Sequence, residues 1–171
     1  MTQPMFAAVV RPAEVRAILA IDPGPTKSAY VIFTDGLPTA TEKLPNEEVL
    51  AIARHWRGSA TAIEWITVAS IAGAEIYQTC RWVGRFEQAS DVPVVLLPRA
   101  DVLQHFFGKR NVKGADALIR RTMLDRYGGD GAKGVKAHPG PLYGFHADCW
   151  SALAVAIAHA EGAKPAEPKT S

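Results

Sequence analysis

Short unbroken apolar runs alternate along the chain with polar segments that contain glycine and proline. The first run, residues 17–21, leads straight into Asp22 and then into Pro23-Gly24, which turn the chain. An unbroken apolar run of this length is typical of a strand that is buried on both faces. A similar run at 61–66, which Glu64 interrupts, and an unbroken run at 94–97 predict two further buried strands. The hydrophobic pattern therefore predicts a sheet that is covered on both sides.

The remaining elements follow from turn residues and apolar spacing. Residues 28–33 and 38–43 complete a three-stranded meander, because Asp35-Gly36 between them is typical of a hairpin turn. Apolar spacing and capping residues predict helices over 46–56, 71–90, 99–107, 115–127 and 146–160. Residues 128–144 contain six glycines and two prolines and are expected to form a long flexible connection. This order predicts an α/β fold, a mixed five-stranded sheet with helices on both faces.

A length of 171 residues fits one domain. We expect that domain to span residues 17–161, with an N-terminal extension at 1–16 and a disordered tail at 162–171. Hydrophobic residues make up 48% and charged residues 21% of the chain, as in soluble globular proteins. No apolar run reaches the roughly 18 residues of a membrane helix. The absence of a signal pattern and of a disulfide framework leads us to expect a cytoplasmic protein.

The positive charge is unevenly distributed along the chain. The net charge is only +2, but residues 99–136 hold nine Lys and Arg against four Asp and Glu. A local basic region of this kind can bind the phosphates of a nucleic acid. The simpler alternative is a solvated loop and helix face.

Three acids stand where a carboxylate is costly unless it has a partner. Asp22 ends the first strand, Glu64 lies within the 61–66 strand, and Asp148 is in the first turn of an otherwise almost uncharged helix. If the first and fourth strands are neighbours, the three acids converge, and Mg²⁺ or Mn²⁺ can offset their repulsion. One such ion, or a pair about 3.5–4 Å apart, activates water for phosphodiester cleavage. Simpler roles stay open, a turn for Asp22 and a helix cap for Asp148.

The same acids carry a resemblance to a known family. In order and spacing, three motifs resemble those of the RuvC family of Holliday-junction resolvases: Ile21-Asp22-Pro23-Gly24 with Ser28, Ala62-Ile63-Glu64, and Asp148 ahead of residues 151–156. Segments 73–86 and 139–144 are similar to its phage and prophage branch. The resemblance implies a ribonuclease-H-like fold, a homodimer, and metal-dependent nicking of two strands of a four-way DNA junction. It also implies that Asp22, Glu64 and Asp148 are the catalytic metal ligands.

The chain departs from this family at the last helix and after the first strand. Bacterial members usually carry a second ligand three residues from the acid of the last helix, where this chain has Ser151. The fourth ligand therefore stays open among His146, Ser151, Asp116 and a water molecule. Ala29 stands where glycine is common in the family.

The aromatic residue that stacks on a base near the junction centre in this family is also missing. Thr67 stands at the matching position. Trp65 and Tyr77 are candidate substitutes for it, although we expect Trp65 to be a core residue because tryptophan is usually well buried.

Basic side chains of the last third of the chain are candidate DNA contacts. They are Lys109, Arg110, Lys113, Arg120, Lys133 and Lys136. Such side chains neutralise phosphates and position DNA without reading its sequence. By resemblance, Lys113 is also a catalytic candidate that stabilises charge at the scissile phosphate.

These features lead to one main hypothesis and two alternatives. The main hypothesis is a homodimeric, metal-dependent endonuclease that cleaves branched DNA. The first alternative is a DNA-binding or scaffold protein of the same fold without activity, which Ser151 favours. The second is an actin-like phosphotransferase, which normally needs two domains of this size.

Overall fold

The apolar run that opens the chain forms the centre of the sheet. In the computed structural model, which describes residues 16–66 and 73–163, β1 (Ala17–Asp22) lies between β2 (Lys27–Thr34) and β4 (Ala60–Trp65). β3 (Leu37–Pro45) and β5 (Val94–Pro98) complete the order β3-β2-β1-β4-β5. The first three strands are antiparallel, whereas β1, β4 and β5 are parallel. The predicted mixed five-stranded sheet is confirmed.

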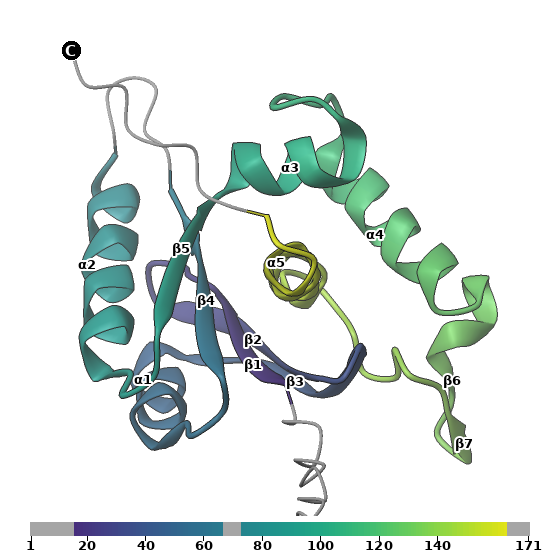
Figure 1. Ribbon diagram of the computed structural model, residues 1–171, viewed down its shortest axis with the longest axis horizontal. Coiled ribbons are helices and arrows are strands. Elements are labelled where there is room, and N and C mark those ends of the chain that lie inside the picture. The colour runs from purple at the N-terminus through teal and green to yellow at the C-terminus, as the bar shows by residue number, and fades with distance from the viewer. Residues whose placement is uncertain (1–15, 67–72, 164–171) are drawn as a thin grey trace, which may run out of the picture.

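Helices cover both faces of this sheet, as predicted. α1 (Asn46–His55) and α2 (Ala74–Ala89) lie on one face (Figure 1). α5 (Cys149–Ala160) crosses the other face, with α3 (Arg99–Phe107) and α4 (Ala115–Arg126) around it. Each face has its own hydrophobic core, because neighbouring residues of the buried strands point to opposite sides.

α5 is the most deeply buried helix in the described part of the chain. Every residue from Cys149 to Ala158 is buried except Ser151. The sheet presents the small side chains of Ala20, Ala29 and Ala62 to the same core, so the alanine-rich helix can approach the strands closely. Close packing of this kind fixes the start of α5 relative to the ends of β1 and β4.

The segment 128–144 is more ordered than expected, so the prediction of a long flexible connection is wrong. It forms a short 3₁₀ helix (Gly129–Lys133) and a small hairpin of β6 (Gly134–Val135) and β7 (His138–Pro139). Ala132 and Leu142 are buried in the α5 core, and the Leu142 amide donates to the Ala132 carbonyl. These two apolar anchors explain why a glycine-rich segment is held in place.

Some predictions fall wholly or partly outside the described residues. They concern most of the extension at 1–16, most of the tail at 162–171, Thr67, and the first two residues of the helix expected over 71–90. The predicted domain boundaries therefore stay a prediction. Within the described part of the chain, no helix is both long enough and apolar enough to cross a membrane.

The turn after β1 is held by buried polar side chains. Ser28 and Asn46 are 0% and 2% exposed. The Ser28 hydroxyl donates to Asn46 Oδ1 over 2.6 Å and accepts from the Gly24 amide over 3.2 Å, while Asn46 Nδ2 donates to the Gly24 carbonyl over 2.9 Å. This network ties the turn that follows Asp22 to β2 and α1, and so holds the end of β1 in place.

Replacing Asn46 should weaken the fold measurably. Asn46→Ala leaves the buried Ser28 hydroxyl and the Gly24 carbonyl without this partner, which should cost about 1–3 kcal/mol of unfolding free energy. Urea denaturation measures this cost. The matched control Asn111→Ala changes an exposed asparagine and should stay within about 0.5 kcal/mol of wild type. Equal effects of the two substitutions would contradict the role given to the network.

Candidate active site

The two strand acids point to the same side of the sheet. Ile21 of β1 and Ile63 of β4 are paired, and both lie in the core under α1 and α2. The next residues, Asp22 and Glu64, therefore face the opposite side, toward α5. Because β1 and β4 are parallel neighbours, the two carboxyl groups come together at their carboxyl ends.

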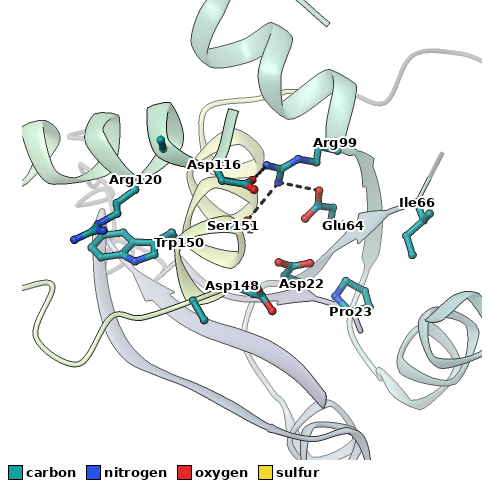
Figure 2. Close-up of a pocket in the computed structure, with 12 residues that line it drawn as sticks. Asp22, Pro23, Glu64, Ile66, Arg99, Asp116, Arg120, Asp148, Trp150 and Ser151 are labelled. Carbon is teal, nitrogen blue, oxygen red and sulfur yellow. Dashed lines mark hydrogen bonds and ion pairs between the residues drawn. The ribbon is translucent and has the colours of Figure 1, made fainter. Parts of the chain in front are cut away.

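The start of α5 brings the third acid to the same place. Asp22, Glu64 and Asp148 line one cavity of about 610 Å³ together with Arg99, Asp116 and Ser151 (Figure 2). Asp148 is the N-cap residue of α5, but its side chain makes no capping hydrogen bond and forms an ion pair with Lys43 of β3. The helix-capping explanation of Asp148 is therefore wrong. The predicted convergence of the three acids on one cavity is observed.

Asp22 and Glu64 form a crowded carboxyl pair. Burial raises the pKa of Asp22 well above its usual range, and the nearby charge of Glu64 raises that pKa further. Burial also raises the pKa of Glu64, while the Arg99 guanidinium works against that rise. The Asp22 carboxyl donates a hydrogen bond to Glu64 when it is protonated. The pair thus holds a proton readily in the absence of a cation.

Arg99 is the cation nearest to this pair. It is the first residue of α3 and directly follows β5, so it starts from the same edge of the sheet as Glu64. Its Nη1 lies 3.3 Å from Glu64 Oε1 and 3.3 Å from Ser151 Oγ, and its Nη2 pairs with Asp116 (Figure 2). Sequence reasoning missed Arg99, although its position directly after a buried parallel strand is a signal that could have found it.

The donor atoms of the cavity suit a hard divalent cation. Carboxylate and hydroxyl oxygens are the ligands that Mg²⁺ and Mn²⁺ prefer. Within residues 16–66 and 73–163, however, no three acid, histidine or cysteine side chains are grouped closely enough to hold an ion as they stand. Glu64 is paired with Arg99, and Asp148 is paired with Lys43. An ion that binds Asp148 therefore has to compete with Lys43.

The candidates for a fourth ligand lie at different places. Ser151 lines the cavity, but its hydroxyl accepts a hydrogen bond from Arg99. Asp116 also lines the cavity, with its side chain 90% exposed. His146 points elsewhere, because its Nδ1 lies 2.9 Å from the Gly144 carbonyl and its Nε2 lies 3.6 Å from Glu42.

The predicted DNA contacts divide into three groups. Arg120 lines the cavity, and both Arg120 and Lys133 lie over the Trp150 ring, 5.8 Å and 5.3 Å from its centroid. Arg110 pairs with the buried carboxylate of Asp101. The other three lysines are exposed and do not line the cavity: Lys109 and Lys113 before α4, and Lys136 in the β6–β7 turn.

Trp65 corrects one expectation about the core. It is 37% exposed, so its assignment to the core is wrong. The physical reason is that Trp65 is the last residue of β4, where the chain leaves the covered part of the sheet. Tyr77 on α2 is 63% exposed.

Lys43 is a further residue that sequence reasoning missed, and no pattern in β3 distinguishes it.

The fold matches known structures, although the sequence matches no family. No protein-family model matches the chain, and no curated protein matches it significantly. RuvC of Thermus thermophilus superposes with a TM-score of 0.59 at 18% identity, over 88% of this chain and 99% of that chain. The same protein in complex with a Holliday junction substrate gives 0.59 at 17% identity over the same shares. The chain therefore has a RuvC-like, ribonuclease-H-like fold, as the resemblance implied.

A viral structure is a more distant match. The Fowlpox virus resolvase, solved with Holliday junction DNA, superposes with a TM-score of 0.49 at 16% identity. The superposition covers 84% of this chain and 98% of the viral chain.

The carboxyl pair should make the metal-free protein less stable as the pH rises. Because the folded pKa of Asp22 is raised above the usual aspartate value of 3.8, the folded state binds more protons than the unfolded state above that pH. The stability that this proton contributes is lost as pH rises through the folded pKa. In EDTA, Asp22→Asn should therefore have a higher unfolding free energy than wild type at pH 8, with a smaller difference toward pH 4.

Urea denaturation over this pH range measures the difference. The control Asp130→Asn changes an acid whose side chain is 86% exposed and should show no such pH-dependent gain. A wild-type profile that runs parallel to that of Asp22→Asn would contradict the crowded pair.

Proposed function

We propose that this protein is a divalent-metal-dependent endonuclease that hydrolyses phosphodiester bonds in branched DNA, including four-way junctions. The observation that carries the proposal is the convergence of Asp22, Glu64 and Asp148 on one cavity, from two neighbouring strands and the start of α5. Three acids around one cavity are costly for stability and useful for binding cations. The RuvC-like fold supports the same proposal.

In this proposal each acid has a stated task. Asp22, Glu64 and Asp148 bind Mg²⁺ or Mn²⁺, which, when bound, supplies charge to activate water and to stabilise the leaving oxygen. Asp22 is the central ligand, because it lies between Glu64 and Asp148 and is influenced by both charges. Burial of the pair excludes bulk water from one side of the cavity and strengthens its electrostatic interactions.

The basic residues around the cavity bind the DNA backbone in this proposal. Arg120 and Lys133 flank the cavity beside Trp150, and Lys109 and Lys113 reach out from the loop before α4. Arg110 contributes less, because its charge is already paired with Asp101. Lys136 contacts DNA from the β6–β7 turn, and Lys113 approaches the scissile phosphate. The contacts are to phosphates and therefore do not depend on sequence.

The four-way junction is the proposed substrate because of the fold likeness. The matching Thermus thermophilus RuvC structure is a complex with a Holliday junction substrate. We extend to this chain the homodimer of the resembled family, since two copies place two cavities on one junction. α2, with its exposed Tyr77, is the proposed contact surface between the copies. We further propose membership of the phage and prophage branch and action in the cytoplasm.

One observation favours the alternative of an inactive DNA-binding protein. Arg99 and Lys43 already pair with Glu64 and Asp148, so two of the three acids are neutralised by the chain itself. In a protein without catalysis these pairs would be permanent. Cleavage of a labelled junction with and without Mg²⁺ separates the two functions.

Removal of the central ligand should abolish cleavage while leaving the fold and DNA binding in place. Asp22→Asn should slow Mg²⁺-dependent nicking of a labelled four-way junction by about 100-fold or more, since a lost metal ligand removes several kcal/mol of transition-state stabilisation. Fork and duplex DNA in the same assay test the preference for the junction.

The control Glu48→Gln changes an exposed acid of α1 outside the cavity and should cleave like wild type. Junction cleavage by Asp22→Asn at the wild-type rate would refute the assignment. A wild-type protein that binds the junction but never nicks it would establish the inactive alternative.

The exposed lysines should strengthen junction binding and make that binding more dependent on the salt concentration. Lys109→Ala and Lys113→Ala should each weaken junction binding and lower the slope of log K against log salt by about 1. Arg110→Gln should change the slope less than either lysine variant. Fluorescence anisotropy from about 50 to 200 mM salt measures these slopes. Lysine variants with the wild-type slope would show that Lys109 and Lys113 do not contact the DNA phosphates.

A further inference from the structure

Arg99 is placed in the acid cavity by the same sheet register that places Glu64. β5 runs parallel to β4, with Leu97 paired to Glu64 and Pro98 to Trp65. Arg99 follows at once as the first residue of α3. The backbone therefore delivers a guanidinium group to the carboxyl end of the sheet, next to a carboxylate that is only 8% exposed.

The guanidinium group is held from three separate elements. Nη1 donates to Glu64 of β4 and to Ser151 of α5, and Nη2 donates to Asp116 of α4 (Figure 2). A planar group with several donors keeps one position when its partners lie in different directions. Arg99 thus fills the side of the cavity between Glu64 and Ser151 with a fixed positive charge.

Within the described residues, the cation on the opposite side of the cavity is Lys43, whose ammonium group pairs with Asp148 alone. Asp22 lies between Glu64 and Asp148 and lines the cavity from the end of β1 (Figure 2). Among the basic residues that line the cavity, Arg120 is directed onto the Trp150 ring and away from the acids (Figure 2). Lys43 pairs with Asp148 at the rim, where that carboxylate is 50% exposed.

We propose that Arg99 takes the place of a second metal ion, so that the cavity binds a single divalent cation on the side of Asp22 and Asp148. This inference rests on the proposed metal-dependent function and specifies its cofactor requirement. Three carboxylates and Arg99 leave two negative charges, which one divalent ion neutralises. Lys43 and Asp116 at the rim carry charges of +1 and −1, so together they leave this sum unchanged.

Ser151 completes the arrangement by being neutral. It lies on α5 three residues after Asp148 and one turn along the same helix face, so its side chain also faces the cavity. A hydroxyl group accepts the hydrogen bond from Arg99 without adding charge. A carboxylate at this position would supply the ligand that a second ion needs against the repulsion of Arg99.

Counting bound Mn²⁺ tests the inference without any cleavage. Titration of the full chain, without DNA, followed by electron paramagnetic resonance of free Mn²⁺, should give one ion per wild-type chain. Arg99→Gln removes the competing charge beside Glu64 and should tighten binding of that ion by about tenfold. The double variant Arg99→Gln/Ser151→Asp should bind two ions per chain. Arg121→Gln, which breaks an ion pair with Asp125 on α4, should behave like wild type.

The outcomes separate this inference from the proposed function. Two Mn²⁺ ions per wild-type chain, with Mg²⁺-dependent junction cleavage, would overturn the single-ion inference and leave the nuclease proposal standing. A wild-type chain that binds no ion and cleaves no junction would overturn both. Unchanged Mn²⁺ affinity in a folded Arg99→Gln variant would also overturn the role of Arg99. The wild-type count decides the stoichiometry even if a variant fails to fold.

Discussion

Mutual repulsion between two neighbouring carboxyl groups is the constraint on which the site depends. Asp22 and Glu64 are brought together by the pairing of β1 with β4, which fixes the positions of their backbones. Two basic side chains offset part of the negative charge: Arg99 forms an ion pair with Glu64, and Lys43 forms one with Asp148. Arg99 also lowers the pKa of Asp22, but burial and the charge of Glu64 outweigh it, so that pKa stays raised. A cation placed beside the two carboxylates would relieve this repulsion.

The framework of this site could be predicted from the sequence. Apolar runs identified the central strands, and two of them contained an acid at or near the end, Asp22 and Glu64. Since the carboxyl ends of parallel neighbours meet at one edge, their convergence followed from strand order alone. Asp148 followed from the position of a single acid at the start of an apolar helix. These inferences hold because backbone pairing and burial are encoded locally.

The partners of the acids could not be predicted in the same way. The contacts of Arg99 depend on the register of β4 with β5 and on the direction in which α3 leaves the sheet. Lys43 reaches Asp148 from 105 residues away, through two antiparallel pairings. Trp65 was misplaced because composition does not show where a strand stops being covered. Order in the 128–144 segment arose from Ala132 and Leu142, two apolar residues among many glycines.

The burial of α5 has a consequence for how the protein matures during synthesis. The cavity combines an acid from the first strand with one at the start of the last helix, and that helix is almost completely enclosed by the sheet, α3 and α4. A nascent chain on the ribosome can form the β1–β3 meander early, but it lacks Asp148 until nearly all described residues have emerged. The complete three-acid cavity is thus absent until translation has passed α5.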